Sequence, residues 1–165
     1  MRLDASAPVR TLFFEDFSAG QSYASATLRV EAAAITAFAA EFDPQPFHLD
    51  DEAGRQSLFG GLAASGWHTA AMTMRLLVAG EFRPAGGILG IGGELTWLAP
   101  VHPGDVLRVV AEIVETRLSR SRPAHGLVKV RVATLNQHGE TVQTFTPTLL
   151  VERRDAKQAP DSADR

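Results

Sequence analysis

The sequence predicts an α+β fold in which an antiparallel sheet wraps around one long central helix. Residues 61–79 are small or apolar on nearly every side, and a helix of that composition has to be buried by other structure. The chain after residue 87 is divided into runs rich in Val, Ile, Leu and Thr, which favour strands. Because the connections between these runs are short, we expect antiparallel hairpins.

Turn residues separate the predicted strands of the second half, as in Pro103-Gly104-Asp105. Valines alternate with charged residues around Lys129 and Arg131, which is typical of a sheet with one solvent-exposed face. The predicted strands are residues 88–98, 106–116, 127–135 and 142–151.

The first half of the chain predicts a strand followed by a short helix. Residues 21–30 alternate loosely and can form the strand, whereas residues 31–42 change period. Pro44 disfavours helical geometry at Asp43, and Pro46 is expected to prevent the helix from resuming. Apolar residues at i, i+3, i+4 and i+7 define one face of this helix: Ile35, Phe38, Ala39 and Phe42.

The long helix is predicted to begin at Gly60-Gly61 and to end at Gly80, which can form its C-cap. A sheet wrapped around such a helix is the hotdog fold. Four or five strands leave a free sheet edge, and pairing two edges across a two-fold axis removes it. We therefore expect a homodimer.

The composition fits one domain that needs no disulfide bonds or structural metal for its stability. The chain has 165 residues, is 45% hydrophobic and contains no cysteine, which excludes a disulfide framework, a thiolate zinc site and a cysteine nucleophile. A reducing cytosol is compatible with this, and we expect a cytoplasmic protein. The domain is predicted at residues 11–151, with a loose arm at 1–10 and a disordered tail at 152–165.

The distribution of charged and apolar residues argues against nucleic acid and membranes as partners. The net charge is −3 with both signs scattered and no block of Lys or Arg, so we expect no nucleic-acid partner. The N-terminus has no apolar core of signal-peptide length. The longest apolar-rich stretch, residues 61–79, is interrupted by His68 and Arg75, whereas a membrane span needs about 20 mostly apolar residues. We expect no membrane partner.

The loop after the short helix carries the residues best suited to chemistry. Asp43 and His48 are five residues apart, and the prolines between them stiffen the loop. A partly desolvated carboxylate is a good base because burial raises its pKa, and an imidazole gives or takes protons near neutral pH. The pair can therefore handle both protons of a water addition. A turn aspartate and a packed histidine are the structural alternative.

The predicted start of the long helix is a second candidate. Backbone N–H groups there are unpaired, and the diglycine lets a ligand approach, so Gly61 can bind a polarised carbonyl oxygen. A tight turn explains the glycines equally well. Thr69, two turns along, can bond a substrate or its own i−4 carbonyl. No histidines have the helical spacing of a metal pair, so we expect no metal and no cofactor.

These motifs together resemble MaoC-like dehydratases and R-specific enoyl-CoA hydratases, in which a helix ends in an Asp-x-Asn-Pro-x-His loop. The likeness extends over residues 13–151, with Gln45 in place of the usual asparagine and Phe42 in place of a small residue. The stretches that carry it are residues 38–48, Phe59-Gly60-Gly61, residues 64–69 and the turn at 98–105.

The resemblance implies a hydratase acting on an enoyl thioester of coenzyme A or of an acyl carrier protein. Asp43 and His48 would be its catalytic acid–base pair, Gly61 would bind the thioester oxygen, and Thr69 falls where some members have a serine. Two alternatives stay open, because one fold hosts several activities: a thioesterase, or a non-catalytic acyl-thioester-binding protein. Coenzyme A phosphates would need cations, for which the candidates are Arg75, Arg120 and Arg122.

Overall fold

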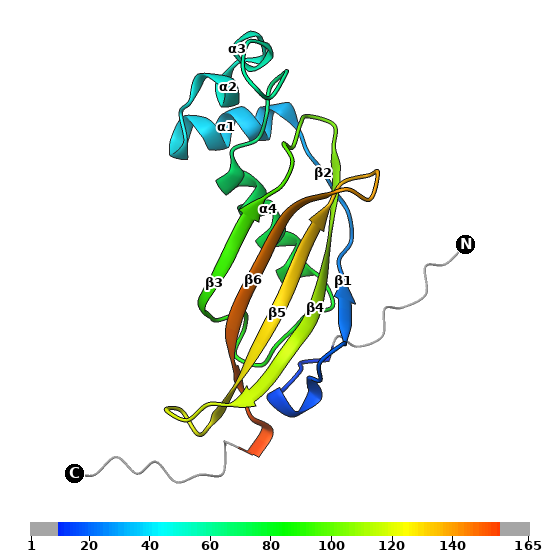
Figure 1. The fold of residues 1–165 in the computed structure, drawn as a ribbon, viewed down its shortest axis with the longest axis vertical. Helices are drawn as coiled ribbons and strands as arrows, with labels where there is room; N and C mark the ends of the chain where they lie inside the picture. The colour runs from blue at the N-terminus through cyan, green and yellow to red at the C-terminus, as the bar shows by residue number, and fades with distance from the viewer. Residues whose placement is uncertain (1–9, 156–165) are drawn as a thin grey trace, which may run out of the picture.

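The computed structural model describes residues 10–155 as one antiparallel sheet with a long helix, α4 (Gly66–Ala79), against one of its faces (Figure 1). The strand order is β1–β4–β5–β6–β3, and β2 pairs separately with β4. The predicted hotdog architecture is confirmed. The strands are β1 (Ser22–Ala24), β2 (Leu28–Arg29), β3 (Gly90–Trp97), β4 (Val106–Leu118), β5 (His125–Leu135) and β6 (Thr141–Glu152).

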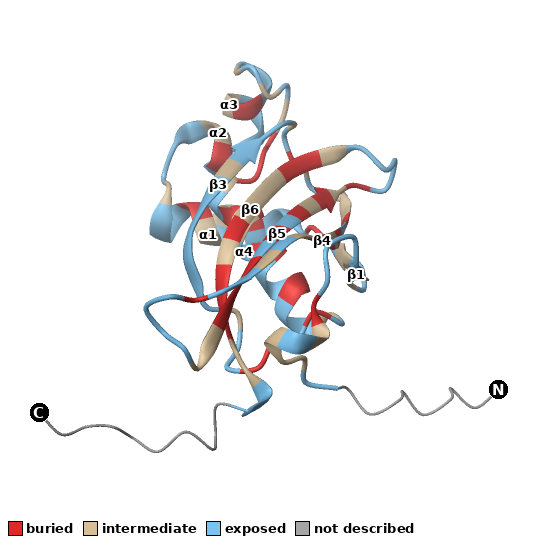
Figure 2. Cartoon of the chain, turned by 60° about the horizontal axis from the view of Figure 1, so that its bottom comes forward, coloured by how far each residue is buried: buried red, intermediate tan, exposed pale blue. Residues whose placement is uncertain are grey.

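The core lies between α4 and the inner face of the long strands. Buried and exposed positions alternate along β4 and β5, as Figure 2 shows, because successive side chains of a strand point to opposite faces. Full burial of each such aliphatic side chain contributes about 1.5–3 kcal/mol. The inward residues include Leu107, Val109, Ala111 and Ile113 of β4, Val128, Val130 and Val132 of β5, and Met72, Leu76 and Leu77 of α4.

The strand predicted at residues 21–30 is interrupted, so that β1 and β2 pair with different parts of β4. Ser25 lies in the gap, where its N–H donates to the Val109 carbonyl oxygen at 3.0 Å. The Val109 N–H in turn donates to the Ser25 hydroxyl at 2.8 Å. A side chain thus replaces a backbone acceptor, which breaks the regular ladder at this residue.

Short helices gather at one end of the sheet (Figure 1). The predicted helix forms as α1 (Ala32–Phe42) and ends before Pro44. The prediction that Pro46 blocks a new helix is wrong, because Pro46 is the first residue of α2 (Pro46–Leu49). Proline is tolerated there, since the first N–H of a helix has no partner within it. α3 (Asp51–Arg55) follows, and a 3-10 helix, η1 (Phe14–Asp16), lies near the other end.

The central helix differs from its prediction in two respects. It begins at Gly66 rather than Gly61, with Ser65 as N-cap. It is also not enclosed on all sides within one chain, because Trp67 and Val78 are 60% and 56% exposed. The small, apolar composition before Ser65 suits a tightly packed segment as well as a helix, so composition alone misplaced the boundary.

The C-terminal boundary of the domain lies beyond the predicted residue 151. β6 continues to Glu152, and the next two residues contact the N-terminal part of the chain. Arg154 Nη2 lies 2.6 Å from Asp16 Oδ2, and its N–H donates to Glu15. Residues 152–155 therefore belong to the fold, whereas the rest of the predicted tail and residues 1–9 lie outside the described residues. Within the described part, no helix has the length and apolarity that a membrane crossing requires.

Candidate active site

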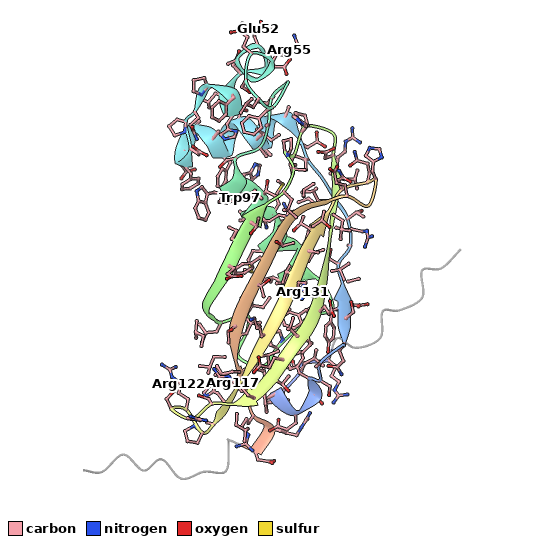
Figure 3. All side chains as sticks on the ribbon, in the orientation of Figure 1. Glu52, Arg55, Trp97, Arg117, Arg122 and Arg131 are labelled. Carbon is pink, nitrogen blue, oxygen red and sulfur yellow. The ribbon has the colours of Figure 1, made fainter. Side chains whose placement is uncertain are left out.

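A cavity of about 460 Å³ lies where the loop after α1, helix α2, the start of α4 and the end of β3 meet. Figure 3 shows Trp97 at this end of β3, beneath the short helices. The polar side chains in its wall are those of Asp43, Gln45, His48 and Thr69. The apolar wall includes Phe47, Phe59, Trp67, Trp97 and Val101. A larger hollow of about 780 Å³ beside β1 contains none of the predicted site residues.

Asp43 is held by hydrogen bonds to both carboxylate oxygens. Its position follows from the end of α1, where its N–H donates to the Ala39 carbonyl at 2.9 Å. The Ser65 hydroxyl donates to Oδ2 at 2.6 Å, and Gln45 Nε2 donates to Oδ1 at 2.7 Å. These contacts stabilise the ionised form and orient the carboxylate.

The pKa of Asp43 is lowered from its ordinary value, mainly by the hydrogen bond from Ser65. Partial burial acts in the opposite direction, while the amide of Gln45 and the charge of His48 lower the pKa further. The expectation that the pKa of Asp43 would be raised is therefore wrong. Burial contributes as expected but is outweighed by hydrogen-bond donors, above all Ser65, that lie outside the predicted site.

His48 is buried on α2 with its two ring nitrogens in different surroundings. Nδ1 lies 2.7 Å from the carbonyl oxygen of Ala63, and because a carbonyl only accepts, Nδ1 carries a proton. Nε2 lies 3.5 Å from Asp43 Oδ2 and is therefore the nitrogen that can exchange a proton. The rings of Phe47 and Phe59 lie 4.6 Å and 5.7 Å from the imidazole and restrict its movement.

The first residue of α4 brings a backbone donor to the same cavity. Gly66 is part of the cavity wall, and the N–H groups of a first helical turn have no partner within the helix. Trp97 Nε1 donates to the Gly66 carbonyl at 2.8 Å. A Cβ at Gly66 would lie 2.6 Å from Cε2 of that ring, so the contact requires glycine.

The structure brings three of the four predicted site residues to the cavity. Asp43 and His48 meet as expected. Thr69 reaches the wall, although its hydroxyl donates to the Ser65 carbonyl at 3.3 Å, which is the local i−4 bond. Gly61 is not among the lining residues, and it precedes α4 by five positions. Its predicted role as the donor at the helix start therefore does not hold.

Ser65, Gly66 and Trp97 are absent from the predicted site. Serine is a favoured N-cap, and requiring a cap for the long helix would have moved its start to Gly66. No sequence pattern identified Trp97, because its contact with Gly66 joins β3 to α4 across 31 residues.

The predicted phosphate-binding arginines are not gathered at the cavity. Arg122 lies with Arg117 at the far end of the sheet from Trp97 (Figure 3), and Arg120 belongs to the same hairpin. Arg75 is on α4 but outside the cavity wall. Among the described residues, no group of three His, Cys, Asp or Glu side chains could hold a metal ion.

The fold places this chain among the hotdog-fold proteins. A family model described as MaoC like domain matches residues 16–136. The chain belongs to the MaoC-like domain family.

Known relatives agree with this assignment. The crystal structure of the MaoC-like dehydratase from Rhodospirillum rubrum matches this chain with a TM-score of 0.84 and 57% sequence identity. The match covers 87% of this chain and 98% of that one. The 3-hydroxybutyryl-CoA dehydratase of Methylorubrum extorquens is 31% identical over 69% of this chain and 71% of its own length. The mesaconyl-CoA hydratase of Cereibacter sphaeroides is 32% identical over 90% of this chain, which spans only 43% of that protein.

Proposed function

We propose that this chain is a hydro-lyase that adds water to the double bond of an enoyl thioester, or removes it in the reverse reaction. The observation that carries the proposal is the separation of 3.5 Å between Asp43 Oδ2 and His48 Nε2 in the wall of a ligand-sized cavity. A single water can contact both atoms. The hydratase and dehydratase named among the relatives support the same reaction class.

In the hydration direction, the pair starts as an ionised Asp43 beside a His48 that carries a proton on Nε2. Asp43 takes a proton from the water while the water oxygen forms a bond to the β-carbon. The electron pair of the double bond moves toward the thioester oxygen, and His48 Nε2 delivers a proton to the α-carbon. The proton on Asp43 then passes to Nε2, so that the pair returns to its starting state. Only Nε2 takes part, because the Nδ1 proton is engaged by the Ala63 carbonyl.

The developing negative charge on the thioester oxygen needs a donor, and we assign this role to the Gly66 N–H in place of Gly61. The amide opens α4, so the positive end of the helix dipole adds to the hydrogen bond. Removal of one oxyanion donor typically costs about 3–4 kcal/mol of transition-state stabilisation. Trp97 fixes this donor, because its indole N–H is bonded to the carbonyl of the same residue.

The lining of the cavity suits an uncharged acyl group. Most of the wall is aromatic or aliphatic, and no Arg or Lys of the described chain belongs to it. Asp43 is ionised at neutral pH, because its pKa is lowered. A substrate carboxylate would therefore meet the like charge of Asp43, while the cationic group of the wall, His48, is already paired with Asp43. We propose a coenzyme A thioester with a neutral acyl chain.

A second copy of the chain is the partner we propose. β3 has β6 as its neighbour on one side, and most of its residues are exposed. Ile91 is 58% exposed, and Val78 on α4 is also exposed. A sheet edge with unpaired backbone groups and exposed apolar side chains favours pairing with another strand. Pairing of β3 with its copy across a two-fold axis would cover the exposed apolar side chains and give the unpaired backbone groups hydrogen-bond partners.

The test is an assay of the purified chain with crotonyl-CoA, followed by the loss of enone absorbance. Asp43→Asn and His48→Gln should each reduce kcat at least about 100-fold, because each removes one partner of the proton transfer. Asp50→Asn and His138→Gln are the matched controls: asparagine caps α3 as well as aspartate does, and His138 is exposed.

Three outcomes would contradict the proposal. Near-normal turnover in either site variant would remove Asp43 or His48 from the reaction. Release of free thiol without hydration would indicate the thioesterase. Binding of the thioester without any turnover would indicate a binding protein in which the pair is structural.

A further inference from the structure

Ser65 lies between the helix start and the carboxylate of the proposed acid–base pair. Its hydroxyl is 2.6 Å from Asp43 Oδ2, the oxygen that also faces His48 Nε2. Ser65 is fully buried. Its backbone carbonyl accepts from the N–H and the hydroxyl of Thr69, which anchors the residue on α4. The hydroxyl is therefore shielded from bulk solvent.

The side chain of Ser65 makes two hydrogen bonds that use different parts of the hydroxyl. As N-cap it accepts from the Trp67 N–H at 3.2 Å with a lone pair of the oxygen. Capping does not need the hydroxyl hydrogen. That hydrogen is donated to Asp43, because a carboxylate can only accept. The contact with Asp43 is thus additional to what the start of α4 requires.

We propose that Ser65 is a positioning residue for the reaction: its hydroxyl holds the Asp43 carboxylate ionised and turned toward His48 Nε2. The inference rests on the proposed function of the Asp43–His48 pair. The hydrogen bond occupies one lone pair of Oδ2, while Gln45 occupies one on Oδ1. The carboxylate is held at both oxygens, and lone pairs remain for a water beside Nε2.

The charges around Asp43 allow the effect of Ser65 on the Asp43 pKa to be measured separately from that of His48. His48 on α2 is the titratable group that bears on Asp43 among the described residues, and the neighbours on α4 and in the loop are the uncharged Ser65 and Gln45. The hydrogen bond from Ser65 is the largest influence on the pKa of Asp43. Loss of a donor to the ionised form raises a carboxyl pKa.

The test compares Ser65→Gly and Ser65→Thr in the full-length chain. Glycine keeps most of the N-cap preference but lacks the donor, whereas threonine retains both functions. In Ser65→Gly, the ¹³C resonance of the Asp43 carboxyl, assigned with Asp43→Asn, should titrate about one pH unit higher. The acidic limb of kcat/KM should move by the same amount. Ser65→Thr should restore both.

Thr73→Val serves as a control for stability, since it removes buried hydrogen bonds from α4 without touching Asp43. It should lower the melting temperature and leave the Asp43 titration unchanged. If Ser65→Gly does not fold, Ser65→Cys, a weaker donor, should show a smaller shift in the same direction. An unchanged titration in a folded Ser65 variant overturns the inference. Because the titration does not require turnover, it stays decisive even if the wild-type chain lacks hydratase activity.

Discussion

The indole of Trp97 lies directly against Gly66, and its Nε1 donates to the Gly66 carbonyl at 2.8 Å. The end of β3 thereby contacts the first residue of the central helix, next to the proposed acid–base pair. The contact leaves no room for a side chain at Gly66, and Gly66 lines the cavity.

Gly66→Ala should impair the reaction more than it impairs the fold. The new Cβ would lie 2.6 Å from the ring of Trp97, so either the indole or the helix start has to move. We expect kcat/KM for crotonyl-CoA to fall about 100-fold, as when an oxyanion donor is misplaced. Gly61→Ala is the matched control, because the nearest atom to its Cβ, Asp51 Oδ1, is 3.7 Å away. Equal activity of the two variants would remove Gly66 from the site.

The lowered pKa of Asp43 predicts a pH dependence of stability. A group with a depressed folded pKa stabilises the fold above its unfolded value, here 3.8, and loses this contribution as the pH falls through the folded value. The difference in unfolding free energy between wild type and Asp43→Asn should therefore change in one direction: Asp43 should favour the wild type more at pH 6 than at pH 3. Urea titrations at the two pH values measure this. A difference that is constant, or that grows in acid, contradicts the lowered pKa.

The apolar cavity predicts a preference between two related substrates. Crotonyl-CoA presents a neutral chain, whereas mesaconyl-CoA adds a carboxylate that would lie near the ionised Asp43. We expect kcat/KM to be at least about 100-fold higher for crotonyl-CoA, since an unpaired charge in such a site costs several kcal/mol. Parallel assays at one pH measure the ratio. Comparable or better hydration of mesaconyl-CoA would show that a cation reaches the cavity from elsewhere.

The exposed edge strand predicts the behaviour of one surface substitution. Ile91→Lys places a charge on β3, where it should disfavour pairing with a second copy. The molar mass measured by light scattering should fall from dimer to monomer. Leu118→Lys is the control, because Leu118 is similarly exposed, at 56%, and lies on β4 away from this edge. A dimer that survives Ile91→Lys would place the interface elsewhere.

The sequence by itself determined the parts of this protein that depend on local patterns. Alternating valines predicted the long strands, the apolar spacing of residues 31–42 predicted α1, and the loop from Asp43 to His48 predicted two residues that meet at the cavity. These features follow from side-chain periodicity and from prolines acting on their own neighbours. The physical information is contained within a few residues, so no tertiary contact is needed to read it.

The tertiary structure decided which groups surround the pair and how they affect it. Gly61 and Gly66 look alike in sequence, yet only Gly66 is pressed against Trp97 and opens onto the cavity. The pKa of Asp43 falls rather than rises because Ser65, 22 positions away, donates to it. Such contacts join distant segments, and their strength depends on distances of a few tenths of an ångström. Local propensity does not contain that information, because it arises only when α4 docks on the sheet.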